Sequence, residues 1–291
     1  MDLRAISMGL VFALIWSSAF TSARIIVTDA PPLASLALRF FLSGIIGISI
    51  ARALGQSMQL NLEQWKATFV FGLCQNALYL GLNFYAMQTI EASLASIIAS
   101  SMPLMVAAAS WAFFKERLPM FSIVGLALGI SGVTIIMATR IEQGVDATGV
   151  ALCATAAIAL TLATLSMRNA SSGGNLLMIV GLQMLVGSAI LAIASITTEK
   201  LIINVTLPLV IAFIYTTLVP GLLATWIWFK LVDRIGAVRA ATFHFLNPFF
   251  GVIIASNILD EKLKLGDFLG VVIIMISILS VQISREKNHN Q

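Results

Sequence analysis

Charged residues are scarce in this sequence. Asp, Glu, Lys and Arg make up 10% of its 291 residues, whereas about a quarter of the residues of a soluble domain are charged. Hydrophobic residues make up 59%, and the mean hydropathy is +0.99. Charge-free windows long enough to cross a bilayer recur along the whole chain, with short connections between them. This pattern excludes a soluble globular protein and predicts an all-α, polytopic membrane protein.

Signals of an enzyme are also missing. No H-E-x-x-H or G-x-S-x-G motif occurs, and no acidic residue lies in the middle of an apolar window. Cys74 and Cys153 both lie in apolar windows, where a small buried hydrophobe is more common than a disulfide or a metal ligand. His244 and the many serines leave an intramembrane serine–histidine enzyme open as an alternative. We nevertheless expect no catalytic residue, no metal and no cofactor.

The apolar windows predict ten transmembrane helices, because each needs roughly 20 residues to cross a bilayer core. The eighth contains Pro220-Gly221, which can interrupt it. The first is not expected to be a signal peptide, since no cleavage site followed by a polar mature chain comes after it. The predicted spans are 5–25, 33–52, 67–87, 92–113, 120–139, 147–167, 176–197, 206–229, 238–259 and 267–284.

The formal net charge of +4 is spread unevenly over the loops. With the N-terminus in the cytoplasm, eleven Lys and Arg residues fall on the cytoplasmic side and five on the other. The positive-inside rule therefore favours both termini in the cytoplasm. This bias accounts for the positive charge without nucleic acid. The expected partners are a small-molecule substrate and membrane lipid, and the chain is expected to be a monomer or a homodimer.

One charged corner occurs twice in the chain. The stretch FFKERLP returns in altered form as LDEKLK, so that Glu116 and Glu261 lie 145 residues apart. The same offset links Pro103 to Pro248. Each half, 1–140 and 141–291, then holds five spans, and an odd number means that the second half enters the membrane from the opposite side. Such inverted repeats are typical of alternating-access carriers.

These stretches, together with PPLASLALRFFLSG, ASLASIIASSMPLM and AATFHFLNPFF, resemble the drug/metabolite transporter superfamily, specifically its ten-helix EamA-type branch. The resemblance covers essentially the whole chain. It implies an exporter of small metabolites, amino acids and related compounds in a bacterial inner membrane. The small multidrug members of the superfamily keep an acidic residue in their first helix. This chain has none there, which argues against proton-driven export of cationic drugs.

Arg39 is the one charge in the interior of the second predicted span. A charge in mid-span costs at least ~2.5 kcal/mol on insertion scales, so it usually faces a cavity or a partner. One interpretation is a contact to a substrate carboxylate. The other is a scaffold role, in which the side chain reaches the membrane surface or binds carbonyls at a helix end. The matching place in the second half, near Gln183, is neutral.

The third span carries a polar stripe of Asn76, Tyr79 and Asn83. Spacings of three and four place these residues on one face of an α-helix. Two amides and a hydroxyl beside an aromatic ring suit the wall of a substrate cavity. The alternative is hydrogen bonding between helices, which membrane bundles use often. The stripe favours the cavity because three polar side chains share the face.

Matched prolines lie in the fourth and ninth spans. Kinks at Pro103 and Pro248 would suit hinges that let each half rock, and a fixed bend is the alternative. His244 and Asn247 precede the second proline and are candidate cavity residues. His244 could bind substrate or sense pH, although a lone intramembrane histidine is more often satisfied by a neighbour. Proton coupling through His244 and uncoupled efflux both stay open.

Trp16 lies in the centre of the first span and could stack on an aromatic or apolar ligand. Trp226 and Trp228 lie near a helix end, where tryptophans anchor at the membrane interface. In the fifth span, the closely spaced small residues at 125, 129 and 132 are typical of a tight packing face. That face could also hold a homodimer.

The leading hypothesis is export of amino acids, aromatic ones among them, or of related compounds. The substrate-binding residues would be Trp16, Arg39, Asn76, Tyr79, Asn83, His244 and Asn247. A nucleotide-sugar or sugar-phosphate exchanger ranks lower, because phosphates need several convergent cations and Arg39 is the one available away from the span ends. A channel is disfavoured by the matched prolines, and an enzyme by the missing motifs.

Overall fold

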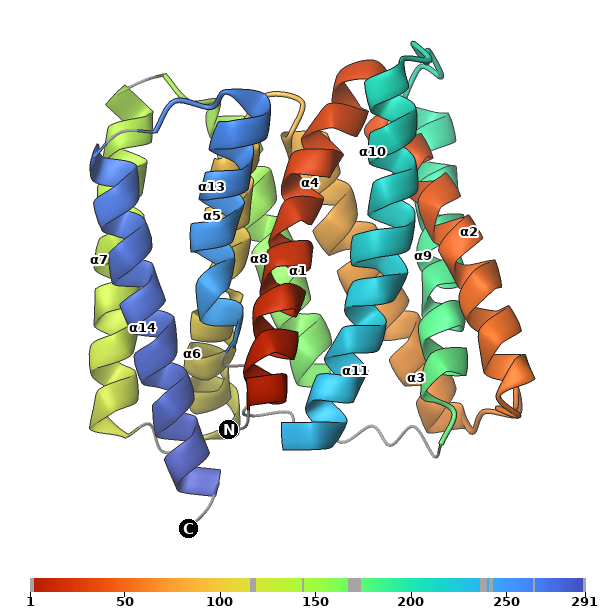
Figure 1. The fold of residues 1–291 in the computed structure, drawn as a ribbon, viewed down its shortest axis with the longest axis horizontal. Coiled ribbons are helices and arrows are strands. Elements are labelled where there is room, and N and C mark those ends of the chain that lie inside the picture. Colours follow the sequence, from red (N-terminus) through yellow and green to blue (C-terminus); the bar gives the residue numbers. More distant parts are fainter. Residues whose placement is uncertain are drawn as a thin grey trace. The chain divides into compact units, whose positions relative to one another are not determined.

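Long apolar runs separated by short polar corners determine the helices of this protein. The computed structural model describes residues 3–115, 119–142, 144–166, 174–235, 240, 243–263 and 265–289. All regular secondary structure in these ranges is helical (Figure 1). In chain order, the elements are α1 (Leu3–Asp29), α2 (Pro32–Ala53), α3 (Leu62–Phe71), η1 (Gly72–Leu80), α4 (Gly81–Ala86), α5 (Ala92–Ser100), α6 (Met102–Phe114), α7 (Met120–Glu142), α8 (Ala147–Ser166), α9 (Leu176–Thr198), α10 (Leu207–Leu218), η2 (Val219–Leu223), α11 (Ala224–Ile235), η3 (Phe243–Leu246), α13 (Asn247–Leu259) and α14 (Leu265–His289). The segments η1 and η2 are π-helical, and η3 is a 3-10 helix.

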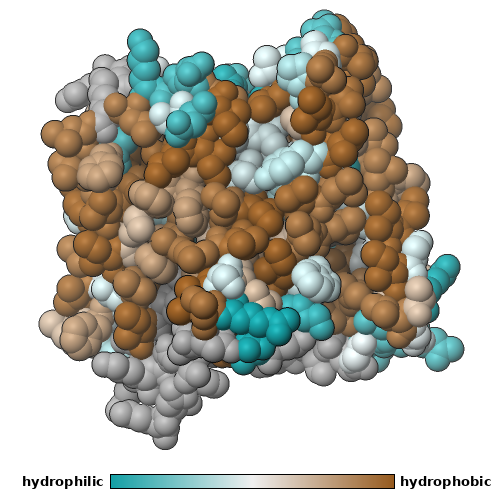
Figure 2. Space-filling model, in the orientation of Figure 1, coloured by the Kyte–Doolittle hydropathy of each residue, from teal (hydrophilic) through white to brown (hydrophobic). Residues whose placement is uncertain are grey.

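These elements confirm the all-α, polytopic fold. Seven helical stretches are long and apolar enough to cross a membrane, and two shorter apolar ones follow near the C-terminus. The third predicted span is found as the consecutive segments α3, η1 and α4. Hydrophobic side chains cover most of the visible surface in Figure 2. Large apolar residues such as Phe121 and Ile130 are mostly exposed, as lipid-facing side chains are.

The helices pack into two compact units, which are not the two repeats. Unit 1 comprises residues 1–21, 89–150 and 223–291, and unit 2 comprises residues 22–88 and 151–222. Unit 1 is built around α7 packed on α14 and α5 packed on α13. Unit 2 is built around α2 packed on α9, with η1 and α3 also against α9. Each unit therefore combines corresponding helices of both halves of the chain.

The two charged corners share one backbone conformation. Lys115 ends α6 with φ 54° and ψ 28°, and Asp260 ends α13 with φ 55° and ψ 29°. They are the non-glycine residues with positive φ in the described ranges, and they are 145 residues apart. Left-handed backbone is uncommon outside glycine, so its recurrence at this offset confirms that the corner is repeated. Glu116 of the first corner lies outside the described residues.

In unit 1, α7 and α14 meet along the small-residue face predicted in the fifth span. A Cβ on Gly125 would lie 3.0 Å from the carbonyl oxygen of Ser277, and a Cβ on Gly270 would lie 2.9 Å from that of Gly132. The Ser277 hydroxyl donates to the Gly125 carbonyl oxygen at 2.5 Å. Only glycine allows the backbones to approach this closely. The small-residue face of α7 therefore packs against α14 of the same chain.

In unit 2, α2 and α9 complete each other's first turns. The Glu199 carboxylate, which follows α9, accepts hydrogen bonds from the backbone N–H groups of Leu33 (2.8 Å) and Ala34 (3.0 Å) in α2. Gln56, which follows α2, accepts one from the backbone N–H of Met178 in α9 at 3.0 Å. Leu33 and Met178 are again 145 residues apart. This reciprocal capping is what two antiparallel copies of one motif produce.

Candidate functional site

The residues predicted for the site are divided between the two units. Unit 2 holds Arg39, Asn76, Tyr79 and Asn83, and unit 1 holds Trp16, Pro103, His244, Asn247 and Pro248. That these residues line one site stays a prediction, and each unit is described by itself.

Arg39 is buried within unit 2. It lies seven residues after the start of α2, about 10 Å along the helix, and only 7% of its surface is exposed. Its Cζ lies 5.3 Å from the centre of the Phe40 ring, and its Nε has no hydrogen-bond partner. The two ion pairs found among the described residues both belong to another arginine, Arg140. This burial argues against a side chain that reaches the membrane surface, and it leaves a buried donor without an acceptor.

A second buried donor lies one helical turn further along α2. The Ser43 hydroxyl has no hydrogen-bond partner either, and the residue is 1% exposed. Both side chains face Gly221 of η2. A Cβ placed on Gly221 would lie 3.6 Å from Ser43 Oγ and 3.7 Å from Arg39 Nη2. Arg39 and Ser43 thus form a pair of buried donors that both lie beside Gly221. Nothing in the sequence predicted this arrangement.

The π-helical turn η2 lies at the predicted interruption of the eighth span. Pro220 has no backbone N–H to donate, and its ring displaces the carbonyl one turn earlier, so regular α-helical hydrogen bonding cannot continue there. The chain takes a wider π turn over Val219–Leu223 before α11 begins. Such turns are frequent at functional sites. Here the turn places a residue without a side chain beside Arg39.

The polar stripe of the third span is buried, but its amides bind other parts of the protein. Asn76 Nδ2 donates to the Gln183 carbonyl oxygen of α9 at 3.0 Å. Asn83 Nδ2 donates to the Tyr79 carbonyl oxygen at 2.8 Å, and its Oδ1 accepts from the Cys153 thiol of α8 at 3.2 Å. The contacts with Gln183 and Cys153 are the interhelical bonding that was the alternative to a cavity, whereas the Asn83–Tyr79 bond lies within the span. The span is also π-helical over nine residues, so α-helical spacing does not describe its faces.

In unit 1, aromatic side chains surround His244. Its ring centre lies 5.4 Å from that of Phe12, 6.2 Å from that of Trp16 and 5.3 Å from that of Trp228. Asn247 Nδ2 lies 2.9 Å from His244 Nδ1, in the amide orientation assigned from the hydrogen bonds. Asn247 Oδ1 is buried without a partner. His244 is therefore satisfied by a neighbour, and one amide atom beside it stays free.

Trp228 corrects an expectation. The sequence placed it at the membrane interface with Trp226, yet it packs against Phe12 with ring centres 4.9 Å apart. Trp226 is 56% exposed, as an interface residue should be. Neither Phe12 nor Trp228 could be assigned to the surroundings of His244 from sequence, because their proximity arises from packing of distant segments.

Both matched prolines follow a break in their span. α5 ends at Ser100, and Pro103 lies in the first turn of α6. Pro248 lies in the first turn of α13, after the 3-10 turn η3. A proline is tolerated at a helix start because the N–H groups there have no intrahelical partner. The fourth and ninth predicted spans are therefore both interrupted just before their proline. A hinge motion at these prolines stays a prediction.

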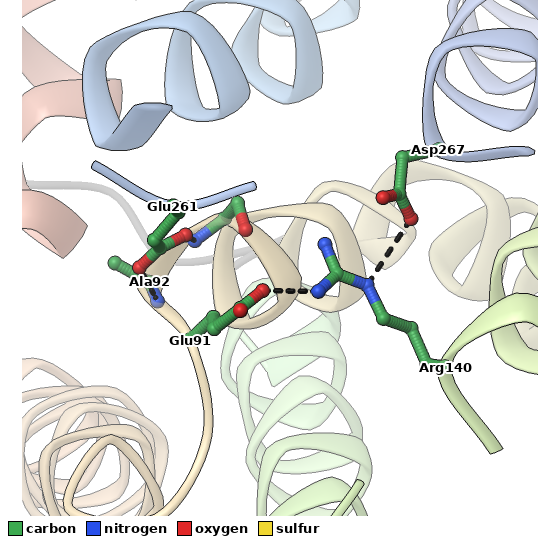
Figure 3. Close-up of polar contacts among 6 residues, drawn as sticks. Glu91, Ala92, Arg140, Glu261 and Asp267 are labelled. Carbon is green, nitrogen blue, oxygen red and sulfur yellow. Dashed lines mark hydrogen bonds and ion pairs between the residues drawn. The ribbon is translucent and has the colours of Figure 1, made fainter. Parts of the chain in front are cut away.

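An ion-pair cluster in unit 1 centres on a buried arginine, Arg140 (Figure 3). Arg140, near the end of α7, binds Asp267 of α14 through Nε at 3.1 Å and Glu91 through Nη1. Beside it, the Glu261 carboxylate accepts from the backbone N–H groups of Ala92 (2.7 Å) and Ser93 (3.0 Å) at the start of α5. Arg140 directly follows the fifth predicted span, 120–139, where its charge predicted nothing beyond a loop position. The cluster ties α5, α7 and α14 together.

An all-helical membrane protein with two inverted repeats, buried polar groups and interrupted helices has the architecture of a secondary transporter. Residues 3–138 and 147–282 each match the EamA-like transporter family. The chain belongs to this family of the drug/metabolite transporter superfamily and is a multi-pass membrane transporter.

Named relatives match over nearly the full chain. The uncharacterized transporter YvbV of Bacillus subtilis is 26% identical over 269 residues, which cover 92% of this chain and 88% of YvbV. The uncharacterized inner membrane transporter YedA of Escherichia coli K12 is 25% identical, with 95% and 90% covered. Protein PecM of Dickeya dadantii is 24% identical, with 92% and 89% covered. A solved crystal structure matches with a TM-score of 0.70 at 18% identity over 99% of both chains, which supports the fold.

Proposed function

We propose that this transporter exports amino acids or related small carboxylates across a bacterial inner membrane by alternating access. The observation that carries the proposal is Arg39, a buried cation whose Nε has no partner. Burial of a charge is costly unless an opposite charge or hydrogen bonds compensate it. A substrate carboxylate supplies both. The site would be filled during transport and empty between cycles.

The chemistry around Arg39 favours a carboxylate over a phosphate. Arginine binds either group through two parallel hydrogen bonds, but a phosphate dianion needs more than one cation to be desolvated. Arg24, the other arginine near this stretch, donates to the carbonyl oxygen of Met87. A nucleotide-sugar or sugar-phosphate exchanger therefore ranks below an amino-acid exporter. An intramembrane enzyme ranks lower again, because the named relatives are transporters.

Within unit 1, we retain Trp16, His244 and Asn247 as candidate substrate contacts. The rings around His244 offer apolar faces that suit an aromatic side chain, and the free Oδ1 of Asn247 can accept a hydrogen bond. Asn76, Tyr79 and Asn83 are weaker candidates, since the two amides are engaged with other helices.

The transport cycle is proposed to use Pro103 and Pro248 as hinges, with both termini in the cytoplasm. The positive-inside bias supports this orientation. Reporters fused after Arg117 and after Lys264 test it. They should lie on opposite sides of the membrane, and a common side would overturn the inverted arrangement of the two corners.

The function is tested by uptake of labelled L-phenylalanine and of other labelled amino acids into inside-out vesicles. A carrier gives saturable uptake and counterflow. Arg39→Met should lower uptake by roughly 10- to 100-fold, the scale of a charge-assisted hydrogen-bonded pair. Arg52→Met is the matched control, because Arg52 lies on the same helix, is exposed and should tolerate the change. Equal uptake by wild type and Arg39→Met would remove Arg39 from the site.

A further inference from the structure

Among the described residues of unit 2, the buried side-chain donors without a partner lie on one face of α2. Arg39 and Ser43 are four residues apart on α2, so their side chains lie one above the other. Nε and Ser43 Oγ are both buried and both without partners. Leaving a buried donor unpaired is unfavourable, and here one of the two donors belongs to a cation.

The edge of the guanidinium that faces Gly221 is the one suited to a carboxylate. Nε and Nη2 lie on the same edge of the planar group, and their two N–H bonds are parallel. Nη2 is the Arg39 atom near Gly221, at 3.7 Å from where a Cβ would be, while Nε has no acceptor. A carboxylate can accept from both atoms at once, in the bidentate geometry that arginine prefers.

Gly221 is not required here by backbone conformation. The positive-φ glycines of the described residues are Gly55, Gly144 and Gly174. A Cβ on Gly221 would meet the Thr216 carbonyl oxygen at 3.2 Å, besides the ordinary contacts to Ser43 and Arg39. An alanine can therefore be accommodated with a small shift. Its methyl group would occupy the space that both free donors face.

We propose that Arg39, Ser43 and the space over Gly221 form a subsite for a single carboxylate group. The carboxylate accepts two hydrogen bonds from Nε and Nη2 of Arg39 and one from the Ser43 hydroxyl. Gly221 determines specificity because a side chain there would contact both donors and compete with the carboxylate for them. The inference rests on the proposed export of carboxylate-bearing metabolites, and it adds two residues and a chemical class to that function. A phosphate dianion is excluded by the single positive charge.

The test measures binding to the purified full-length protein in detergent by calorimetry, with four probes. L-phenylalanine and phenylacetate carry a carboxylate, L-phenylalaninamide lacks it, and phenyl phosphate replaces it by a dianion. Wild type should bind the two carboxylates at least roughly tenfold more tightly than the amide or the phosphate, the scale of one charge-assisted hydrogen bond.

The variants then locate the binding. Gly221→Ala and Ser43→Ala should each weaken carboxylate binding by roughly tenfold and leave amide binding unchanged. Gly47→Ala is the matched control. Gly47 lies on α2, as Ser43 does, and a Cβ there would meet the Cα of Gly181 at an ordinary 3.5 Å. Melting temperatures measured without ligand show whether each variant is folded. If Gly221→Ala does not fold, the affinities of Ser43→Ala alone decide the test.

The outcomes separate the subsite from the proposed function. Saturable phenylalanine transport with wild-type affinities in Gly221→Ala and Ser43→Ala would overturn the subsite and leave the function standing. Phenylacetate binding that both variants weaken, without transport of any amino acid, would support the subsite and overturn amino-acid export. Equal affinity of wild type for the carboxylates and the amide would overturn the subsite.

Discussion

Two buried arginines of this chain have opposite surroundings. Arg140 in unit 1 is 3% exposed and binds two carboxylates, those of Asp267 and Glu91. Arg39 in unit 2 is 7% exposed and binds none among the described residues. One buried guanidinium nitrogen is unpaired in each arginine, Nε in Arg39 and Nη2 in Arg140, so the difference lies in the carboxylates. Where the chain supplies the counter-ions, the arginine joins helices. Where it supplies none, we propose that a ligand carboxylate takes that place.

The strongest test of this contrast removes the cation that is already paired. Arg140→Met leaves Asp267, which is fully buried, without its positive partner. Breaking a buried pair on one side typically costs about 3–5 kcal/mol. The free energy of unfolding should fall by that amount in a denaturant titration in detergent. Adding Asp267→Leu should recover part of the loss, and the exposed Arg52→Met should show none.

Arg39→Met should lower the free energy of unfolding by less than Arg140→Met does, because Arg39 has no carboxylate partner among the described residues. Its main consequence should be reduced transport. If it destabilised the protein as much as Arg140→Met, Arg39 would be a scaffold residue and the contrast would disappear.

The contrast is sharpened by giving Arg39 an acid of its own. Ser43→Asp places a carboxylate one turn away on the same face, so that Arg39 resembles Arg140. Binding of phenylacetate should weaken by at least roughly tenfold, because the internal carboxylate competes for the guanidinium, while the ligand-free melting temperature should not fall. Ser43→Asn is the neutral control of the same size. Unchanged phenylacetate affinity in Ser43→Asp would show that the ligand binds elsewhere.

The smallest expected effect on stability concerns Asp146 of unit 1, whose carboxylate is bound by hydrogen bonds and makes no ion pair among the described residues. Asp146 accepts a hydrogen bond from the Thr89 hydroxyl at 2.6 Å and others from the backbone N–H groups of Gly149 (3.0 Å) and Thr148 (3.1 Å). The Thr89 hydrogen bond, followed by that of Gly149, lowers the pKa of Asp146 below its ordinary value of 3.8. Its stabilisation is therefore present above pH 3.8 and is lost as the pH falls through the lowered pKa.

Asp146→Asn should thus lower the melting temperature slightly at pH 7, and the difference from wild type should narrow at acidic pH below 3.8. A difference that stays constant from pH 7 to pH 3 would mean that the Asp146 charge contributes nothing.

The sequence was sufficient for features that depend on neighbouring residues or on the repeat. Apolar length predicted the spans, and Pro220 predicted the interruption now seen as η2. The offset of 145 predicted matching corners, which Lys115 and Asp260 confirm by their shared backbone conformation. These signals are local or periodic, so they need no knowledge of packing.

The side-chain environments could not be predicted, because they depend on contacts between distant segments. Arg140 binds partners 49 and 127 residues away, and nothing in its own segment identifies them. Asn76 was read as a cavity residue from α-helical spacing, but η1 is π-helical and its amide binds α9. Ser43 was overlooked because one serine in an apolar span has no distinctive pattern. Its significance comes from burial without a partner.

The exchange of end groups between the halves has a consequence for how the chain can be divided. The first turns of α2 and α5 are completed by Glu199 and Glu261 of the second half, and that of α9 by Gln56 of the first. Neither half supplies the acceptors that complete these particular helices. A gene cut between them should yield two fragments that are each incomplete alone and that complement one another when synthesised in the same cell.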